Sequence, residues 1–261
     1  MFVLSSLSSL LSPLSPLSPL FPLFPLPFPT IQLLSVCSRD KSVWIYEIPS
    51  SLFDHSPAPN SDGADCDVVA ILTHHTGDVK SLATIAGDPD DVLLSASYDS
   101  TISVFAADEE GDYSLRATLT DAKEAGCTIW TMAVTPHGTR MYAGTGDGRV
   151  LVYEIGDNFA FRLVGEIAVG DVDAAGVRRP VYSVALPPAT AGHSCLLVAQ
   201  SHGIYLYREA GAGAGGGWRV DAGVKAAHEG DVMSVKYVEG GRGVLSAGEE
   251  GKVRHWRYEI G

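Results

Sequence analysis

The feature that most constrains the fold is an internal repeat with a period of about fifty residues, the range typical of propellers and solenoids. Four segments align without a gap, starting at Asp78, Thr128, Pro180 and Asp231 (DVKSLAT, TIWTMAV, PVYSVAL and DVMSVKY). Each has a β-branched residue, a hydroxyl two places further on and then an apolar residue. This pattern predicts a β-strand. We expect the four segments to be the innermost strands of successive sheets.

A second aligned feature follows each of these strands. A strand of small residues runs into an acidic turn, and an aromatic residue comes six places after the acid. The acid–aromatic pairs are Asp40 and Tyr46, Asp99 and Phe105, Asp147 and Tyr153, and Glu250 and Trp256. The pair at Asp40 has no matching inner strand before it, and at His202 (SHGIYLY) the acid is absent and the turn is one residue shorter. The sequence therefore predicts four complete repeats and the second half of a fifth.

These features resemble those of WD repeats, which build β-propellers from four-stranded blades. His75 and His228 lie three residues before Asp78 and Asp231, where WD repeats carry a histidine. A turn acid, a histidine and a strand hydroxyl can hydrogen-bond together and hold the strands of a blade as one unit. We therefore expect an all-β fold, a WD-repeat β-propeller. Its structural blade residues are His75, His228, Asp40, Asp99, Asp147 and Glu250.

The first thirty residues do not fit this fold. From Leu4 to Pro29 the chain uses only Leu, Ser, Pro and Phe. A signal peptide or a membrane helix would need an apolar stretch without repeated prolines, and a transit peptide would need arginine. These four residues are the ones that pyrimidine-only codons can encode, so we hypothesise a translated polypyrimidine tract from an intron. We expect residues 1–31 to be disordered and residues 32–261 to form a partial propeller.

Charge and cysteine content limit the partners and the cellular compartment that can be expected. The chain has 18 Lys and Arg against 31 Asp and Glu, a net charge of −13, which repels phosphate backbones and anionic membranes. We expect neither nucleic acid nor membrane as a partner. Cys37, Cys66, Cys127 and Cys195 are far apart and form no CxxC or Cys/His cluster. Each falls in or near an expected strand, as small buried thiols do, so we interpret all four as reduced, as suits the cytosol or the nucleus.

The sequence offers little chemistry. Gly211, Gly213 and Gly216 formally match GxGxxG, but a dinucleotide site needs a helix next, and the strand-like run from Trp218 to Val220 follows instead. The acidic cluster at Asp88, Asp90 and Asp91 is interpreted as a solvated turn. No hydrolase, zinc, nucleotide or calcium motif is present. We expect no catalytic, metal or cofactor site, and we expect the surface to carry the function.

One block is more specific than a general WD repeat. The segment CSRDKSVWIYEI, from Cys37 to Ile48, resembles the WD-repeat subunit of the cytosolic iron–sulfur protein assembly (CIA) targeting complex. HTGDVKSL, LSASYDSTISVF, TIWTMAV and the final blade resemble further family blocks in the same order. The resemblance runs from about Leu33 to Ile260.

The resemblance implies a function and partners. The family folds as a seven-bladed propeller and docks a MIP-family adaptor and a HEAT-repeat scaffold, serving client iron–sulfur apoproteins indirectly. The location is the cytoplasm, with the nucleus as a second compartment. The family's exposed functional arginine maps onto Arg39, which could bind a partner carboxylate through a bidentate pair. A solvated arginine that bridges local acids is the alternative.

The chain also departs from the family. The short turn at His202 and the insertion GAGAGGG alter one blade, and about four and a half blades are present instead of seven. Because an open ring leaves unpaired strand edges, we expect the chain as written to be unstable or to aggregate.

Three other functions stay open from sequence alone. They are a general WD-repeat adaptor, for instance in a ubiquitin ligase, a propeller hydrolase or lyase, and a truncated product without function.

Overall fold

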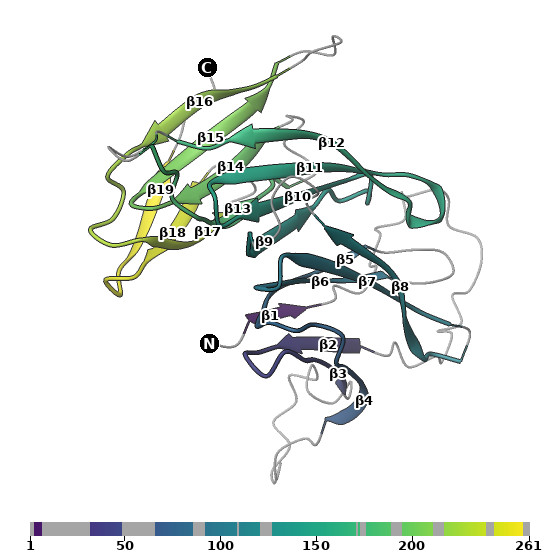
Figure 1. Ribbon diagram of the computed structural model, residues 1–261. Coiled ribbons are helices and arrows are strands. Elements are labelled where there is room, and N and C mark those ends of the chain that lie inside the picture. The colour runs from purple at the N-terminus through teal and green to yellow at the C-terminus, as the bar shows by residue number, and fades with distance from the viewer. Residues whose placement is uncertain are drawn as a thin grey trace, which may run out of the picture.

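The computed structural model describes residues 3–6, 32–48, 66–85, 92–108, 110–120, 127–170, 172, 176–188, 195–210, 217–238 and 243–257. These residues form five antiparallel sheets that follow one another around an arc in chain order (Figure 1). No α-helix occurs in these ranges, and the one helical element is the 3-10 turn η2 (Asp157–Phe159). None of the described helices is therefore long and apolar enough to cross a membrane. The predicted all-β propeller architecture is confirmed.

Four sheets have four strands each, and neighbours in the chain are neighbours in the sheet. They are β1 (Val3–Ser6), β2 (Gln32–Cys37), β3 (Val43–Ile48) and β4 (Asp67–Leu72); β5 (Val79–Ile85), β6 (Val92–Ser97), β7 (Thr101–Ala107) and β8 (Tyr113–Thr120); β9 (Ile129–Val134), β10 (Arg140–Thr145), β11 (Arg149–Ile155) and β12 (Phe161–Ala168); and β13 (Val181–Ala185), β14 (Cys195–Gln200), β15 (Gly203–Glu209) and β16 (Trp218–Val224). The fifth sheet has three described strands, β17 (Val232–Val238), β18 (Gly243–Gly248) and β19 (Val253–Arg257).

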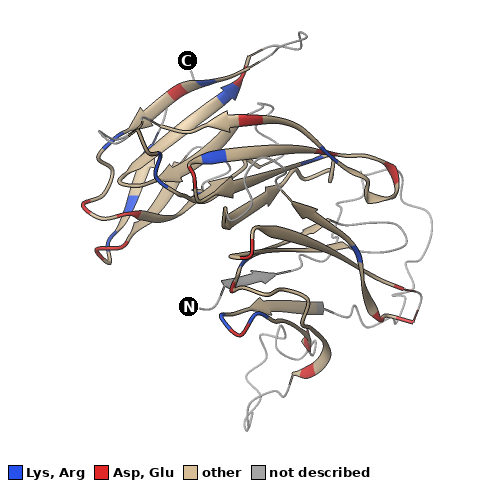
Figure 2. Cartoon of the chain, viewed as in Figure 1, with Lys and Arg blue, Asp and Glu red and all other residues tan. Residues whose placement is uncertain are grey.

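In the second, third and fourth sheets, burial is greatest in the second strand and lowest in the outer strand. All six residues of β6 and of β14 are buried, because these central strands are covered by neighbouring sheets on both faces. The outer strands β8, β12 and β16 are mostly exposed. β6 and β14 accordingly consist mostly of small and branched apolar residues, whereas the outer strands mix apolar and charged ones. Figure 2 shows the charged residues mainly in turns and on outer strands.

The core consists of four clusters, each between two adjacent sheets. Ile45 packs between the first and second sheets, Leu94 and Met141 between the second and third, and Leu196 between the third and fourth. All four side chains are fully buried. Burying a side chain of this size contributes about 1.5–3 kcal/mol. Sheet-to-sheet packing thus holds the arc together.

The predicted inner strands lie side by side. Backbone N–H groups of Met132, Val184 and Val235 donate to hydroxyls on the preceding inner strand. The acceptors are Ser81 (3.1 Å), Thr131 (3.3 Å) and Ser183 (3.2 Å). The hydroxyl that recurs in each repeat therefore links one sheet to the next.

The N-terminal segment differs in part from the expectation. Val3–Ser6 pairs with β2 and occupies the inner-strand position of the first sheet, with Val3 opposite Cys37 and Ser6 opposite Leu34. The repeat at Asp40, expected to lack an inner strand, therefore has one drawn from the Leu/Ser/Pro/Phe segment. Residues 7–31 lie outside the described part of the chain, as do Asp88, Asp90, Asp91 and the glycine loop 211–216.

Candidate interaction surface

One end of the sheets gathers most of the predicted site residues. We call it the turn face and define it by the turns 38–42, 98–101, 146–149, 201–203 and 249–252 and by the ends of the connections that enter β5, β9, β13 and β17. Backbone hydrogen bonds join these segments, for example from Val79 N to Ser38 O (3.1 Å) and from Tyr98 N to Asp78 O (2.8 Å). The turn face is therefore a continuous surface built from several sheets.

His75 and Asp99 form a hydrogen-bonded cluster on the second sheet. Nδ1 of His75 lies 3.0 Å from Asp99 Oδ2, and Nε2 lies 2.8 Å from Ser95 Oγ. Asp99 also accepts hydrogen bonds from the Thr76 backbone (2.8 Å) and from the hydroxyl of Thr101 (2.6 Å). Burial would raise the pKa of Asp99, but these donors outweigh it and lower the pKa to about 2. The cluster fixes the connection before β5 to the β6–β7 turn.

His228 and Glu250 form the corresponding cluster on the fifth sheet. Nδ1 of His228 lies 2.5 Å from Glu250 Oε1, and Nε2 lies 2.7 Å from Ser246 Oγ. The indole of Trp256 donates to the same Ser246 hydroxyl at 2.8 Å. Burial would raise the pKa of Glu250, but hydrogen bonds from His228 and from backbone N–H groups lower it to about 2. The predicted structural placement of both histidines fits this geometry.

The other two turn acids act without a described histidine. Asp147 accepts from the Thr145 hydroxyl and from Arg149 Nε, and these donors lower its pKa against the effect of burial. Asp40 accepts the Ser42 backbone N–H at 3.1 Å, and its hydrogen bonds to Ser42 lower its pKa. Both acids thus stabilise their own turns.

One expectation about these clusters needs correction. The hydroxyls that meet the histidines belong to Ser95 and Ser246 on β6 and β18, and not to the inner strands. The inner-strand hydroxyls bond to the next sheet instead, because they point along the row of inner strands. The aligned repeats identified only the inner-strand hydroxyls, and they did not predict Ser95 and Ser246 as the partners of the histidines.

Arg39 lies in the turn between β2 and β3, and its side chain is 83% exposed. Its Nε lies 3.5 Å from Asp78 Oδ2, and Lys80 Nζ lies 3.0 Å from the same oxygen. Asp78 therefore holds two cations, which lower its pKa. Such exposed pairs contribute little to stability, so Arg39 can exchange Asp78 for an external carboxylate at small cost.

A row of cation and aromatic contacts continues from Lys80 across the turn face. Lys80 Nζ lies 5.6 Å from the ring centre of Tyr98 and 5.3 Å from that of Trp130. Trp130 meets Tyr182 edge-on at 5.2 Å, and the Tyr182 hydroxyl donates to Asp231 Oδ2 at 2.9 Å. This row was not predicted from the sequence, although Lys80, Trp130 and Tyr182 occupy the same position in the aligned inner-strand segments.

Two hollows flank the connection that enters β13. The larger, of about 780 Å³, is lined by Tyr98, Trp130, Val177 and Arg178, among others. The smaller, of about 500 Å³, includes Arg179 in its lining. Successive arginines of one connection therefore line different hollows.

The remaining sequence candidates do not form a reactive site in the described chain. Cys37 and Cys195 are buried, which raises the pKa of each thiol, to about 12 for Cys37. Burial and the nearby Asp147 raise the pKa of Cys127. After the glycine loop the chain continues as β16 (Trp218–Val224), so the strand expected from Trp218 to Val220 is confirmed.

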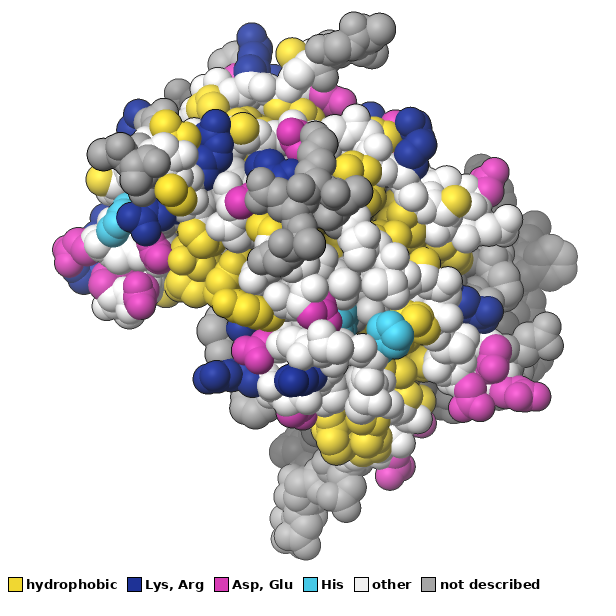
Figure 3. All heavy atoms as spheres, in the orientation of Figure 1, with side chains coloured by type: hydrophobic (Ala, Val, Ile, Leu, Met, Phe, Trp, Pro, Cys, Tyr) yellow, Lys and Arg dark blue, Asp and Glu magenta, His cyan; other side chains and the backbone are white. Residues whose placement is uncertain are grey.

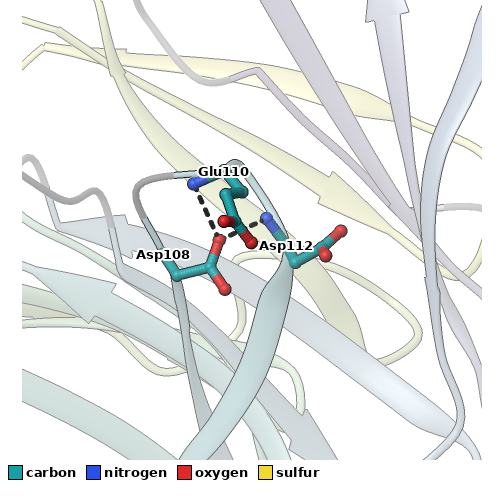
Figure 4. A group of neighbouring side chains, drawn as sticks. All are labelled: Asp108, Glu110 and Asp112. Carbon is teal, nitrogen blue, oxygen red and sulfur yellow. Dashed lines mark hydrogen bonds between the residues drawn. The ribbon is translucent and has the colours of Figure 1, made fainter.

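A group of acids that sequence analysis did not single out lies at the β7–β8 hairpin. It comprises Asp108, Glu110 and Asp112, all exposed (Figure 4). Asp108 Oδ1 accepts the backbone N–H groups of Glu110 (3.0 Å) and Asp112 (2.9 Å). These bonds explain the cluster as a turn, and they give no indication of a metal ion.

The WD domain, G-beta repeat family profile matches residues 66–105 and 223–257. The first match runs from β4 through β7, and the second from the end of β16 to the end of β19. Each repeat thus begins with the outer strand of one sheet and continues into the inner strands of the next. The chain therefore carries WD repeats in these two parts, and its fold is that of a β-propeller.

Solved structures show the same fold at low sequence identity. The chain resembles one in the crystal structure of the Mitotic Checkpoint Complex, with a TM-score of 0.62, 16% identity and coverage of 87% of this chain and 59% of that one. It also resembles Saccharomyces cerevisiae Sqt1, with a TM-score of 0.62, 19% identity and coverage of 88% and 56%.

Curated relatives point to a more specific class of WD-repeat protein. The chain is 36% identical over 121 residues to the Neurospora crassa "Probable cytosolic iron-sulfur protein assembly protein 1", covering 40% of this chain and 25% of the relative. It is 35% identical over 116 residues to the Chaetomium globosum protein of the same name, covering 39% and 24%. The matches thus span about a quarter of these relatives' length. The resemblance to a WD-repeat subunit of cytosolic iron–sulfur protein assembly is confirmed.

Proposed function

We propose that the chain is a non-catalytic docking subunit of the cytosolic iron–sulfur protein assembly machinery. In this role it binds a MIP-family adaptor and a HEAT-repeat scaffold through its surface, for cluster transfer to client apoproteins. It works in the cytoplasm, with the nucleus as a second compartment. The curated relatives' printed name and the WD-repeat fold support this proposal.

The observation that carries the docking role is the geometry of Arg39. Its guanidinium stands on a tight turn of a rigid sheet, with an 83% exposed side chain and one local acid at 3.5 Å. A planar guanidinium presents paired donors that match a carboxylate, so a partner acid can replace the long contact with Asp78 by two short, charge-assisted bonds.

The surroundings of Arg39 support an interface. Lys80, Tyr98, Trp130 and Tyr182 extend from the Arg39–Asp78 pair across three sheets. Aromatic and arginine side chains are enriched where partners bind, because they bury large areas and still offer polar contacts. Tyr98 is 57% exposed, so its ring is accessible to a partner.

The polar groups of the turn face support a non-enzymatic role. Asp99, Asp147 and Glu250 are each engaged in hydrogen bonds within their own sheet. Such bonds keep these carboxylates ionised and oriented toward protein donors, whereas a general acid or base needs a proton near the working pH.

The test is a pull-down of the purified adaptor and scaffold by the full chain, beside the variant Arg39→Glu. Arg162→Glu is the matched control, because Arg162 is also an exposed arginine with a carboxylate partner, Glu154, but lies near the start of β12 at the opposite end of the sheets. We expect the wild-type chain and Arg162→Glu to capture both partners and Arg39→Glu to lose capture, with unchanged circular dichroism.

Two outcomes would count against the proposal. A folded wild-type chain that captures neither partner would leave a general WD-repeat adaptor as the better description. Equal capture by the wild-type chain and Arg39→Glu would keep the assembly role but remove Arg39 from the interface.

A further inference from the structure

The third strand of the fifth sheet has an uncovered edge. In the second, third and fourth sheets an outer strand pairs with the third strand, as β8 does with β7, β12 with β11 and β16 with β15. Within the described ranges β19 pairs only with β18. Most residues of β7, β11 and β15 are buried, whereas no residue of β19 is, and Val253 is 68% exposed. β19 therefore presents a third-strand edge without the cover that its counterparts have.

A groove of about 220 Å³ lies beside this edge, between the fourth and fifth sheets. Leu197, Leu206 and Val224 line it from the fourth sheet, and Val244 and Trp256 line it from the fifth. The lining is thus largely apolar, and Val224 is 40% exposed. An accessible apolar groove beside an uncovered strand edge is typical of a place where another segment binds.

The outer strands of the other sheets show what fills the equivalent place. β8, β12 and β16 each begin with an aromatic residue, Tyr113, Phe161 or Trp218. Each of these rings packs against the core cluster shared with the preceding sheet. Trp218, for example, meets Tyr142 of β10 edge-on at 5.6 Å. Leu197 of the groove has the third place in β14, as Tyr142 has in β10. The groove is therefore the position for the aromatic residue of a fifth outer strand.

Ion pairs between third and outer strands show which charge suits the edge. Glu154 of β11 pairs with Arg162 of β12, and Arg208 of β15 pairs with Asp221 of β16 at 2.7 Å. Glu154, Arg208 and Arg257 each directly follow the aromatic residue of their strand. Arg257 is exposed and lines the groove. Because opposite charges on neighbouring strands attract, a carboxylate on an added strand is the matching charge.

We propose that the edge of β19 and this groove are a docking site for an extended segment of a partner protein, which adds to the fifth sheet as a fourth, antiparallel strand. The segment begins with an aromatic residue that enters the groove, and it carries a carboxylate that pairs with Arg257. In strand addition, main-chain hydrogen bonds provide affinity, and the alternate side chains provide specificity.

This site goes beyond the docking role proposed for Arg39. Arg39 lies in a turn of the first sheet, whereas Arg257 ends β19 of the fifth sheet, away from the turn 249–252. The two sites therefore belong to different ends of the arc and to different ends of their sheets (Figure 1). A result at one site does not determine the result at the other.

The experiment measures fluorescence anisotropy of a fluorescein-labelled peptide, YELEATLT, titrated with the full chain. Its sequence is that of β8, YSLRATLT, with glutamate at the second and fourth places. We expect the peptide AELEATLT to bind about tenfold more weakly, because it leaves the groove unfilled. We expect YKLKATLT to bind about fivefold more weakly, because its lysines meet Arg257.

Variants of the chain test the groove and the charge separately. Ala222→Trp places a ring in the groove, and Val220→Trp is the matched control, since Val220 is 54% exposed on the same strand and is not among the described residues that line the groove. We expect Ala222→Trp to bind YELEATLT about fivefold more weakly and Val220→Trp to stay within about twofold of the wild type. Arg257→Glu should prefer YKLKATLT to YELEATLT, whereas Arg116→Glu, on exposed β8, should keep the preference of the wild type.

The backbone of the peptide gives a further readout. N-methylation of alternate amides should abolish binding for one of the two alternating sets, because only one set faces β19. The proposal would be overturned by undetectable binding of YELEATLT, by equal binding of AELEATLT, by an unchanged preference in Arg257→Glu or by equal binding of both methylated peptides. Dimers of the full chain that Ala222→Trp converts to monomers, without peptide binding, would assign the groove to a second copy instead.

Discussion

The second and fourth sheets achieve the same tie at the turn face by different chemistry. In the second sheet an ionised carboxylate, Asp99, draws together His75, Thr76 and Thr101. In the fourth sheet the neutral amide of Gln200 makes one bond to the Arg179 backbone. The comparison teaches that a blade needs a fixed connection at this place, and that a neutral amide can provide it as well as a carboxylate.

We expect the largest loss of stability at Gly170, which follows β12 and lies against Gln200 of the fourth sheet. Gly170 has a φ of 61°, and a Cβ at this position would lie 2.0 Å from Gln200 Oε1. Gly170→Ala therefore imposes both a left-handed backbone on alanine and a displacement of Gln200. We expect a loss of roughly 2–4 kcal/mol in the free energy of unfolding, measured by urea titration.

Gly176→Ala is the matched control for this prediction. Gly176 has a φ of 77°, but nothing lies within 4 Å of its would-be Cβ. It should lose only about 1–2 kcal/mol, the cost of the backbone conformation. Equal losses at both glycines would show that the Gln200 tie is not tightly packed.

The next largest effects are expected when Asp99 or Gln200 is removed, and the two losses of stability should differ. Asp99→Ala leaves the buried His75 and the Thr101 hydroxyl without their acceptor, and we expect it to cost about 2–3 kcal/mol. Gln200→Ala removes one hydrogen bond and should cost about 1 kcal/mol more than a surface substitution. Thermal unfolding followed by circular dichroism measures both, with Arg116→Ala, at an exposed position of β8, as reference. A larger loss for Gln200→Ala would reverse the ranking of the two ties.

Acid should weaken the second sheet in a way that the fourth sheet cannot share. The pKa of Asp99 is held at about 2 in the folded chain, below its ordinary value of 3.8. The stability that this carboxylate contributes is therefore full above pH 3.8 and is lost as the pH falls toward 2. We expect the melting temperature of the wild type to fall over this range by more than that of Asp99→Asn, measured by differential scanning calorimetry. An equal fall in melting temperature for the wild type and Asp99→Asn would contradict the assignment of this acid sensitivity to Asp99.

The repeat predicted the inner strands, the turn acids and the histidines because these positions recur in the sequence. The fold class followed from this recurrence, which is marked by a turn acid and an aromatic residue in every sheet except the fourth, where the acid is absent. Partners across sheets did not follow, since Ser81 and Ser95 are both small hydroxyl residues and only the three-dimensional arrangement separates their roles. Val3–Ser6 was missed because a Leu/Ser/Pro/Phe composition carries no strand pattern.

The candidate surface was only partly predictable for the same reason. Arg39 was identified through the CSRDKSVW block, but its contact with Asp78 joins two sheets. Near Gln200 the sequence showed only that the following turn lacks an acid. The hollow beside Gln200 depends on how the connections before β13 and β17 meet, which the sequence does not reveal. Figure 3 shows hydrophobic side chains gathered in patches, one of them over β4, where Val68, Val69 and Ile71 are exposed. Sequence periodicity did not predict this exposure.

Arg39 on the turn face is proposed to dock the MIP-family adaptor of the CIA machinery. Its most direct test is the affinity of the full chain for an immobilised MIP-family adaptor, measured by biolayer interferometry for the wild type, Arg39→Glu and Arg162→Glu. We predict that Arg39→Glu binds at least about fivefold more weakly, that Arg162→Glu stays within about twofold of the wild type, and that higher salt narrows the difference. Equal affinity of all three proteins would contradict the claim.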